Sequence, residues 1–302
     1  NKGVLMVNAS SLIFLNGTAV DYVRAILEGR DMKETYRALK RKYRGLSRQV
    51  FQQDHDAIKR QLVGYLAGEH DIIENIGTES PLAGADELPS PYRMDIALTY
   101  NCQNHCAHCY NESKNKPELA PEEWKKNLEW LWDAGIPHIV FTGGEPTLYQ
   151  GLKELIVKSE ELGQITGLIT NGRNLARVGY LRELINAGLD HVQVTLLSHE
   201  EALHDELAGG QGAWRETVDG IKSAVAEDIY LSTNTTIMRR TLEGVEDTMR
   251  FLVSLGVENI AFNALIRSGK GKDAEGISFE ELASILQKLI KIAEEEDINL
   301  IW

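Results

Sequence analysis

After Tyr92 the chain alternates short apolar runs with longer amphipathic stretches, and this alternation constrains the fold more than any other feature of the sequence. Runs rich in β-branched residues predict strands, and apolar residues recurring every three or four positions predict helices. Strands and helices in alternation favour a parallel sheet or barrel covered by helices. Strands are expected at 94–100, 138–142, 165–170, 191–197, 229–237 and 259–264. Helices are expected at 121–134, 150–162, 177–187, 214–226, 243–255 and 279–295.

Six β-α units amount to about three-quarters of a (β/α)8 barrel, so the fold predicted for residues 93–302 is α/β, a partial (β/α)6 TIM-like barrel. In such a barrel the active site lies at the carboxyl ends of the strands. The last residues, 299–302, indicate the start of a seventh strand. Because the chain also begins with Asn1 rather than methionine, we expect it to be part of a longer protein.

All three cysteines of the chain lie in one segment, YNCQNHCAHCYN, as Cys102, Cys106 and Cys109. Three thiolates suit a 4Fe-4S cluster, which usually takes four cysteines, so one iron would keep an open position. Alternatively, His105 or His108 could complete a tetrahedral zinc site with the three sulfurs. The loop alone leaves both metals open, and disulfides are not expected.

A second motif lies in the run IVFTGGEPTL, which ends in Gly143, Gly144, Glu145 and Pro146. Paired glycines at the end of a strand let the backbone come close to a ligand. A carboxylate beside them can accept hydrogen bonds from an ammonium group. Taken alone, such glycines usually mark a turn.

Placed one β-α unit after CxxxCxxC, this motif makes the chain resemble the radical S-adenosylmethionine (SAM) superfamily. In that family the three cysteines follow the first barrel strand and hold a 4Fe-4S cluster. The open iron chelates the amino and carboxylate groups of SAM, and the GGEP segment contacts the amino group. The resemblance implies metal ligation by Cys102, Cys106 and Cys109. It also implies reductive cleavage of SAM to a 5'-deoxyadenosyl radical, with electrons from a donor such as flavodoxin or ferredoxin.

The family places further SAM contacts on or after later strands. The additional candidates carried over onto this chain are His108, Asn171, Thr195, Asn234 and Ile266. His108 would stack beside the adenine, and the backbone of the loop 264–275, which contains Ile266, would receive it. The other candidates would be polar contacts near SAM. Plainer interpretations exist, since threonine is common in strands, Asn-Gly is an ordinary turn and His108 could be an exposed loop residue.

One segment, HDELAGGQGAW at 204–214, departs from the family. Many relatives carry an arginine just before the glycine here, whereas this chain has Leu207, Ala208 and Gly209. The role of that arginine is therefore absent or supplied elsewhere, and the candidates are Arg173, Arg239 and Arg267.

Residues 1–75 show a different pattern, two short strands with a turn at 8–10, then three helices beginning at Thr18, at 32–43 and at 52–67. With Leu15-Asn16-Gly17 before the first helix, this unit resembles the winged-helix pyrroloquinoline-quinone chaperone-like domain, or RiPP recognition element. The resemblance implies a peptide or protein substrate that is presented by this domain. The segment 76–92, which is rich in proline, glycine and acids, is expected to link it to the barrel.

Other functions remain open at this stage. The enzyme could mature a small-molecule cofactor or a tetrapyrrole. A redox-sensing nucleic-acid regulator is a further alternative, since winged-helix units also bind DNA and residues 33–48 are basic. However, a formal net charge of -13 opposes binding to a polyanion, and a sensor has no need of a SAM-binding strand end. No apolar run is long enough to cross a bilayer and no signal peptide is evident, so a cytoplasmic location is expected.

Overall fold

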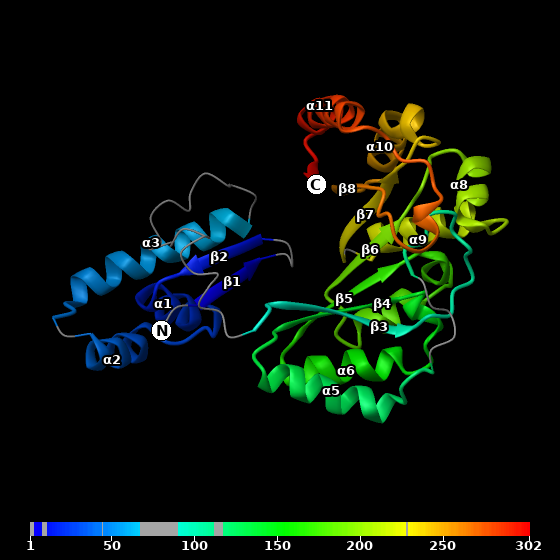
Figure 1. Ribbon diagram of the computed structural model, residues 1–302. Coiled ribbons are helices and arrows are strands. Elements are labelled where there is room, and N and C mark those ends of the chain that lie inside the picture. The colour runs from blue at the N-terminus through cyan, green and yellow to red at the C-terminus, as the bar shows by residue number, and fades with distance from the viewer. Residues whose placement is uncertain (1–2, 8–10, 44, 67–89, 112–116, 228) are drawn as a thin grey trace. The chain divides into compact units, whose positions relative to one another are not determined.

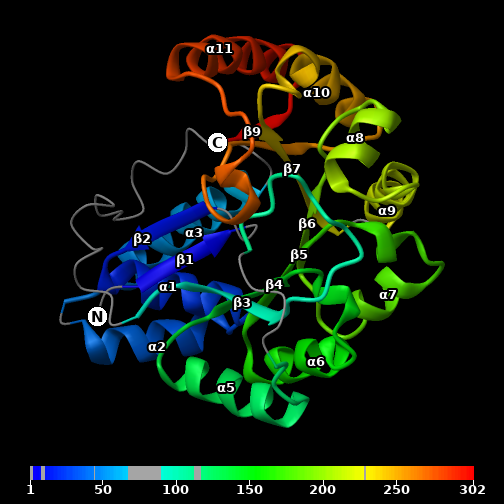
Figure 2. The ribbon, with the colours of Figure 1, turned by 45° about the vertical axis from the view of Figure 1, so that its right-hand side comes forward.

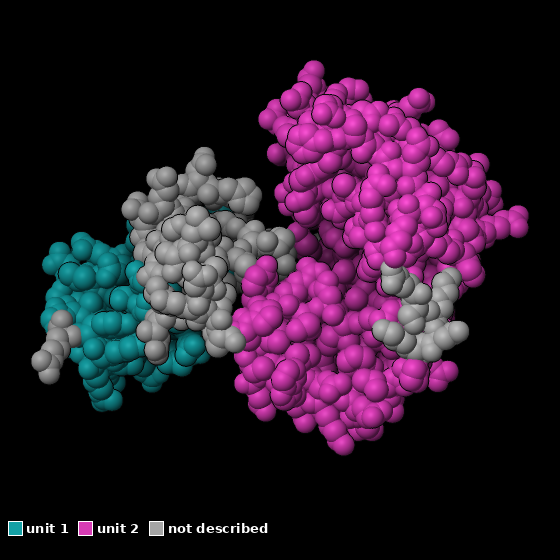
Figure 3. All heavy atoms as spheres, viewed as in Figure 1, with its two compact units in different colours: residues 1–89 teal, residues 90–302 magenta. Residues whose placement is uncertain are grey.

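The computed structural model describes residues 3–7, 11–43, 45–66, 90–111, 117–227 and 229–302. The chain forms two compact units, residues 1–89 and 90–302 (Figure 3). Most of the segment expected as a linker, 76–92, lies outside the described residues. Among the helices that the structure describes, none has both the length and the apolar character needed to cross a membrane.

The first unit is a two-stranded antiparallel sheet followed by three helices (Figure 1). The first helix begins after Asn16, because this side chain accepts hydrogen bonds from the backbone N–H groups of Thr18 and Ala19. Side chains buried in the core of the unit include Leu15, Tyr22, Leu39, Phe51 and Leu62. The elements are β1 (Gly3–Val7), β2 (Ser11–Leu15), α1 (Gly17–Leu27), α2 (Met32–Lys42) and α3 (Arg48–Leu66).

The order of these elements is the expected one, with one difference in length. The helix expected at 52–67 begins at Arg48 instead. The hydroxyl oxygen of Ser47 accepts a hydrogen bond from the N–H of Val50 at 3.1 Å, and this cap supports the additional turn. The expected turn at 8–10 lies outside the described residues.

The second unit is built on seven parallel strands that follow one another in chain order across the sheet. Each strand pairs with the next, and the sheet does not close into a complete barrel (Figure 2). The predicted partial barrel is confirmed, with a seventh strand at its end. The strands are β3 (Arg93–Thr99), β4 (His138–Gly143), β5 (Ile165–Thr170), β6 (His191–Thr195), β7 (Tyr230–Ile237), β8 (Asn259–Ala264) and β9 (Asn299–Ile301).

Helices lie along the outer face of this curved sheet (Figures 1 and 2). Fully buried side chains from strands and helices form one core between the layers, among them Leu128, Phe141, Leu155, Leu168 and Phe262. The helices are α5 (Pro121–Asp133), α6 (Leu152–Leu162), α7 (Tyr180–Ile185), α8 (Glu201–Ala208), α9 (Ala213–Ala226), α10 (Val245–Ser254) and α11 (Phe279–Glu296). Short 3-10 turns occur at η3 (Pro146–Leu148), η4 (Arg173–Ala176), η5 (Leu242–Gly244) and η6 (Gly269–Lys272).

Helix α8 was not expected from the sequence. It has eight residues, too few to show a clear helical period, and it ends at Gly209, which adopts the left-handed conformation with φ 63°. The expected helix at 177–187 is also shorter, because 173–176 form a 3-10 turn and Gly179 has φ 77°.

A buried histidine pair lies at the amino-terminal end of the sheet, where His138 begins β4 and His191 begins β6. Their Nε2 atoms are 2.8 Å apart across Gly167 of β5. A Cβ at Gly167 would lie 2.1 Å from the His191 ring, so only glycine fits between them. Burial lowers the pKa of His138 to about 4 and that of His191 to about 3. Both rings are therefore neutral at pH 7, and one donates to the other.

Candidate cofactor site

A pocket at the carboxyl end of the strands brings most of the predicted site residues together. Those that line it are Cys102, Cys106, His108, Cys109, Gly143, Gly144, Asn171 and Thr195. They come from the loop after β3 and from the ends of β4, β5 and β6. Four predicted residues do not line it, and these are Glu145, Pro146, Asn234 and Ile266.

The cysteine loop is held in place by backbone groups from distant parts of the chain. The N–H of His105 donates to the carbonyl oxygen of Ala208, and the N–H of Ala107 donates to that of Leu207, both at 2.8 Å. A Cβ at Gly209 would lie 2.7 Å from the carbonyl oxygen of His105, so the close approach requires glycine there. Residues 207–209, where the sequence departs from the family, thus support the loop through their backbone.

The loop after β8 supports the other side of the cysteine loop. The N–H of Lys270 donates to the carbonyl oxygen of Cys109 at 2.9 Å, and its ammonium donates to that of His105 at 3.3 Å. The side chain of Ile266 itself is exposed. Its carbonyl oxygen accepts a hydrogen bond from the N–H of Ser268 at 2.9 Å, within the same loop.

The three cysteines line the same pocket, and none of them is fully buried. Burial, followed by the neighbouring Cys102 and Cys109, raises the pKa of Cys106 to about 12. Burial also raises the pKa of Cys102, whose sulfur accepts weak hydrogen bonds from the Asn104 N–H at 3.4 Å and the Asn171 amide at 3.9 Å. Crowded thiolates are unfavourable on their own and become favourable beside bound cations. The donor set thus fits an iron–sulfur cluster.

The alternative of a single metal ion, such as zinc, requires at least three ligands placed around one position. Within the part of the chain that the structure describes, no group of three or more His, Cys, Asp or Glu side chains is arranged to hold one metal ion. His105 is exposed, and His108 lines the pocket with its Nδ1 buried and without a hydrogen-bond partner among the described residues. Burial lowers the pKa of His108, which favours a neutral ring able to stack against a ligand.

Glu145 lies beneath the pocket, not in it. Its carboxylate is completely buried and accepts four hydrogen bonds, from the N–H and hydroxyl of Thr147, the hydroxyl of Thr170 and the N–H of Asn171, at 2.6 to 3.1 Å. Burial raises its pKa, and the four donors oppose that effect. The side chain therefore joins the ends of β4 and β5. Any contribution of this motif to ligand binding comes from its backbone.

The paired glycines before Glu145 are required by close packing against the end of β3. Gly143 has φ 137°, and a Cβ there would lie 2.1 Å from the carbonyl oxygen of Thr99. A Cβ at Gly144 would lie 2.5 Å from the carbonyl oxygen of Asn101. The amide of Asn111 donates to the carbonyl oxygen of Gly143 at 2.9 Å. The glycines thus bring the ends of two neighbouring strands together at the pocket.

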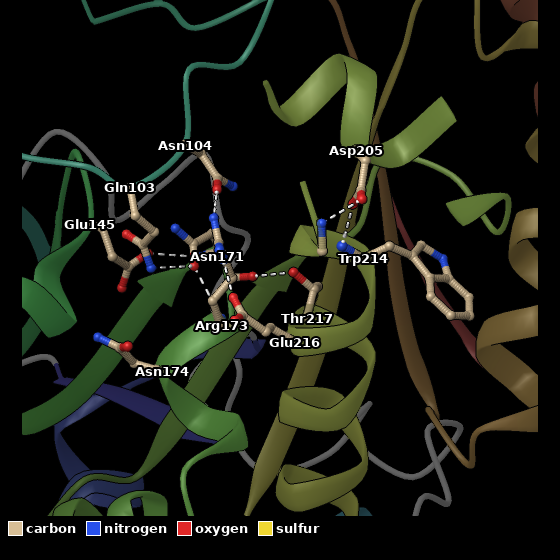
Figure 4. A network of polar contacts seen from close by, with 12 residues as sticks. Gln103, Asn104, Glu145, Asn171, Arg173, Asn174, Asp205, Trp214, Glu216 and Thr217 are labelled. Atoms are coloured by element: carbon tan, nitrogen blue, oxygen red, sulfur yellow. Dashed lines mark hydrogen bonds and ion pairs between the residues drawn. The ribbon is translucent and has the colours of Figure 1, made fainter. Parts of the chain in front are cut away.

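Asn171 is the centre of a polar network beside the cysteines (Figure 4). Its side-chain oxygen accepts from the N–H of Arg173 at 3.0 Å and from the amide of Gln103 at 3.4 Å. Its carbonyl oxygen accepts from the hydroxyl of Thr217 at 2.8 Å. Arg173 in turn donates to the side-chain oxygen of Asn104 at 2.7 Å. Of the three arginines considered from the sequence, Arg173 is thus tied to the cysteine loop.

Asn234 and Pro146 do not line the pocket. The side-chain oxygen of Asn234 accepts a hydrogen bond from Asn263 of β8 at 2.6 Å. Pro146 is buried at the start of η3. The arginine candidate Arg239 forms two hydrogen bonds to the carboxylate of Glu281, at 2.6 and 2.8 Å.

Several residues that line the pocket were missed from the sequence, because neither the motifs nor the segment 204–214 assigns them a ligand contact. They include Asn104, Asn111, Ile169, Leu197, His204 and Ala208. Two of them, His204 and Ala208, lie in α8. They are four residues apart and therefore share one face of the helix, and this spacing is the only pattern in the sequence that relates them.

Comparison with known proteins agrees with this geometry. The model of the radical SAM superfamily matches residues 96–252. The chain belongs to the radical SAM superfamily. This superfamily uses a 4Fe-4S cluster and SAM, and of the two metals that the cysteine loop left open, the cluster is the one that agrees with it.

Curated relatives within the superfamily have peptide substrates in their names. The chain is 31% identical over 185 residues to the PqqA peptide cyclase of Bradyrhizobium diazoefficiens, which covers 60% of this chain and 48% of that protein. It is 30% identical over 179 residues to the PqqA peptide cyclase of Rhodopseudomonas palustris, covering 58% and 47%. The chain thus spans about half the length of the curated relatives it matches.

Solved radical SAM structures share the fold. SuiB of Streptococcus suis bound to its precursor peptide SuiA has a TM-score of 0.65 at 15% identity, covering 99% of this chain and 68% of that one. The protein anSMEcpe with bound AdoMet and a peptide has a TM-score of 0.58 at 15% identity, covering 70% and 64%. At this level of identity the likeness concerns the fold alone.

Proposed function

We propose that this chain is a radical SAM enzyme that abstracts a hydrogen atom from a peptide or protein substrate. The main support is that the three cysteines and the paired glycines of GGEP, far apart in the sequence, line one pocket at the carboxyl ends of the strands. This is where the active sites of α/β barrels lie.

Different residues of the pocket would bind the cluster and SAM. Cys102, Cys106 and Cys109 would hold the cluster, and the cluster with SAM supplies a 5'-deoxyadenosyl radical that takes a hydrogen atom from the substrate. The backbone at Gly143 and Gly144, which lines the pocket, would contact the methionine part of SAM.

Other lining residues would orient SAM and exclude water. Asn171 and Thr195 offer polar contacts, and the neutral ring of His108 offers a stacking surface for the adenine. Ile169 and Leu197 add apolar surface to the same pocket. A reactive radical needs such shielding from solvent.

A peptide substrate is supported by two kinds of comparison. The curated relatives are named as cyclases of the peptide PqqA, and a solved structure with the same fold contains a precursor peptide. We therefore place this chain among radical SAM enzymes that modify peptides, ahead of enzymes of small-molecule or tetrapyrrole biosynthesis.

Within the first unit, the domain formed by residues 1–75 is proposed to bind the peptide. Its element order, two strands and then three helices, resembles the winged-helix recognition domain, and β1 and β2 pair only with each other among the described strands. Each therefore offers an edge to which an extended peptide can add as a further strand. Ile58 and Leu62 of α3 belong to the core of the unit, so exposed neighbours such as Val63 would contact the peptide.

Cluster and SAM are tested by anaerobic reconstitution of the purified chain. About four irons with matching sulfide are expected per chain. Replacing Cys102, Cys106 or Cys109 with alanine should remove the cluster and SAM cleavage together, measured as iron content and 5'-deoxyadenosine. A chain that retains one zinc ion and no iron would contradict the assignment.

Peptide binding is tested with Met6→Pro in β1, which removes one backbone donor and disturbs the strand edge. Met6→Ala is the matched control. If a short peptide is encoded beside the gene, a labelled synthetic copy of it is the probe, and its affinity is measured by fluorescence anisotropy. Met6→Pro should abolish peptide binding and leave SAM cleavage without substrate intact. If deletion of residues 1–75 leaves substrate turnover unchanged, a small-molecule substrate becomes the better assignment.

A further inference from the structure

His204 of α8 lines the cofactor pocket, although no motif marks it. Only 2% of its surface is exposed. Helix α8 also carries Leu207 and Ala208, whose carbonyl oxygens hold the cysteine loop. The imidazole therefore stands on a rigid element that is fixed to the cluster ligands.

The hydrogen bond to one ring nitrogen sets the tautomer. The backbone N–H of Leu197, just past the end of β6, donates to His204 Nδ1 at 3.2 Å. An Nδ1 atom that accepts a hydrogen bond carries no proton, so the proton of a neutral ring is on Nε2. Burial lowers the pKa of His204 to about 4, which keeps the ring neutral at pH 7. The Nε2 atom is thus a hydrogen-bond donor.

The Nε2 atom keeps some exposed surface. It has no hydrogen-bond partner among the described residues, and it is not one of the fully buried polar atoms that lack one. Since His204 is 2% exposed and lines the pocket, the pocket is the site at which this donor can meet a ligand.

The charge of the residues that line the pocket indicates which ligand group the Nε2 donor would contact. Among the described residues that line it, none is lysine or arginine. The cofactor given to this pocket under the proposed function carries a carboxylate in its methionine portion. An anion in a partly dry pocket without cationic side chains needs neutral N–H and O–H donors.

We propose that the Nε2–H of His204 donates a hydrogen bond to the carboxylate of bound SAM and so positions the cofactor. The inference rests on the proposed function, since it takes SAM to be the ligand of the pocket. His204 is a binding and positioning residue in this view, and the bond from Leu197 keeps its donor pointed at the ligand.

Two substitutions separate this role from a structural one. His204→Asn keeps an acceptor where Nδ1 lies, so the bond from Leu197 and the folded structure are retained, but the Nε2 donor is lost. His204→Gln places an amide donor near the Nε2 position and gives up the bond from Leu197. The first variant should lose affinity for SAM, and the second should lose mainly thermal stability.

The experiment measures SAM binding to reconstituted, cluster-loaded wild type and both variants by anaerobic equilibrium dialysis. The Kd of His204→Asn should rise about tenfold, which is ~1.4 kcal/mol. Its iron content and melting temperature should match the wild type. The Kd of methylthioadenosine, which lacks the carboxylate, should be the same in wild type and His204→Asn.

Equal SAM affinity of wild type and His204→Asn would overturn the proposal. An equal loss of affinity for methylthioadenosine would also overturn it, by moving the contact away from the carboxylate. Nitrogen-15 NMR of the wild type gives an independent check, since a proton found on Nδ1 would exclude the donor. If the wild type itself fails to bind SAM, the proposed function fails, and this outcome is distinct from the other three.

Discussion

Replacing the buried carboxylate of Glu145 with an amide should destabilise the protein far more than it weakens SAM binding. In Glu145→Gln one oxygen can keep the three donors that now reach Oε1. The new NH2 group then faces the N–H of Asn171, which donates to Oε2 at 2.8 Å. One hydrogen bond to a charged group, worth about 1.5–3 kcal/mol, is lost and a buried donor is left without a partner.

The neutral amide also escapes part of the burial cost that raises the pKa of Glu145, which offsets some of this loss. The net decrease in the free energy of unfolding is about 3 kcal/mol. For a unit of this size that corresponds to a melting temperature lower by about 6–12 °C. Because the carboxylate does not line the pocket, the Kd for SAM should change by less than about threefold, or ~0.65 kcal/mol.

The assay combines calorimetric melting with anaerobic SAM dialysis. Glu118→Gln is the matched control, since this exposed carboxylate accepts hydrogen bonds from Thr99 and Asn101 at the end of β3. Exposed pairs contribute little, so the control should shift the free energy of unfolding by less than about 1 kcal/mol. An unchanged melting temperature of Glu145→Gln together with a tenfold weaker SAM affinity would refute the reasoning and place the carboxylate on the cofactor.

Two further outcomes follow from the fold. The free energy of unfolding should fall as the pH is lowered from about 6.5 to about 4, because the unfolded chain takes up protons at histidines that the folded protein keeps neutral. In the folded protein the pKa values are about 4 for His138 and about 3 for His191. Urea denaturation of wild type and His138→Gln at pH 7 and pH 5 measures the effect. The free energy of unfolding should change less between the two pH values in the variant than in the wild type. Gly209→Ala should lower cluster retention, measured as iron per chain after desalting, because its Cβ would lie 2.7 Å from the carbonyl oxygen of His105. Gly179→Ala, with φ 77° and no atom within 4 Å of the added Cβ, carries only the conformational cost and should retain its iron.

The sequence was informative where local pattern decides structure. Alternating strand-like and helix-like segments were enough for the strands of the open barrel, since consecutive residues such as 138–141 are all buried. The cysteine spacing and the paired glycines were enough to locate the pocket. Both motifs rely on residue types with few substitutes, cysteine and a residue without Cβ.

Tertiary contacts decided the rest, and they leave little trace in one sequence. Glu145 does not line the pocket, because hydroxyl and N–H donors of Thr147, Thr170 and Asn171 surround its carboxylate, and no local pattern marks those donors. Asn234 lies on the expected strand, and its side-chain oxygen accepts a hydrogen bond from Asn263 of the next strand, a partner that no local pattern marks. His204 was missed because a single histidine in a short helix has no periodic signal.

The support of the cysteine loop by distant backbone groups has a consequence for how the protein matures. During synthesis the cysteines leave the ribosome about a hundred residues before Leu207 and Ala208, and still earlier than Lys270. The loop therefore lacks its fixed shape until the chain has been made through the segment after β8. Loops closed over such long separations form late, because their closure entropy must be overcome first. Iron insertion should thus follow completion of the sheet, and chains arrested before residue 200 should bind cluster weakly even though all three ligands are present.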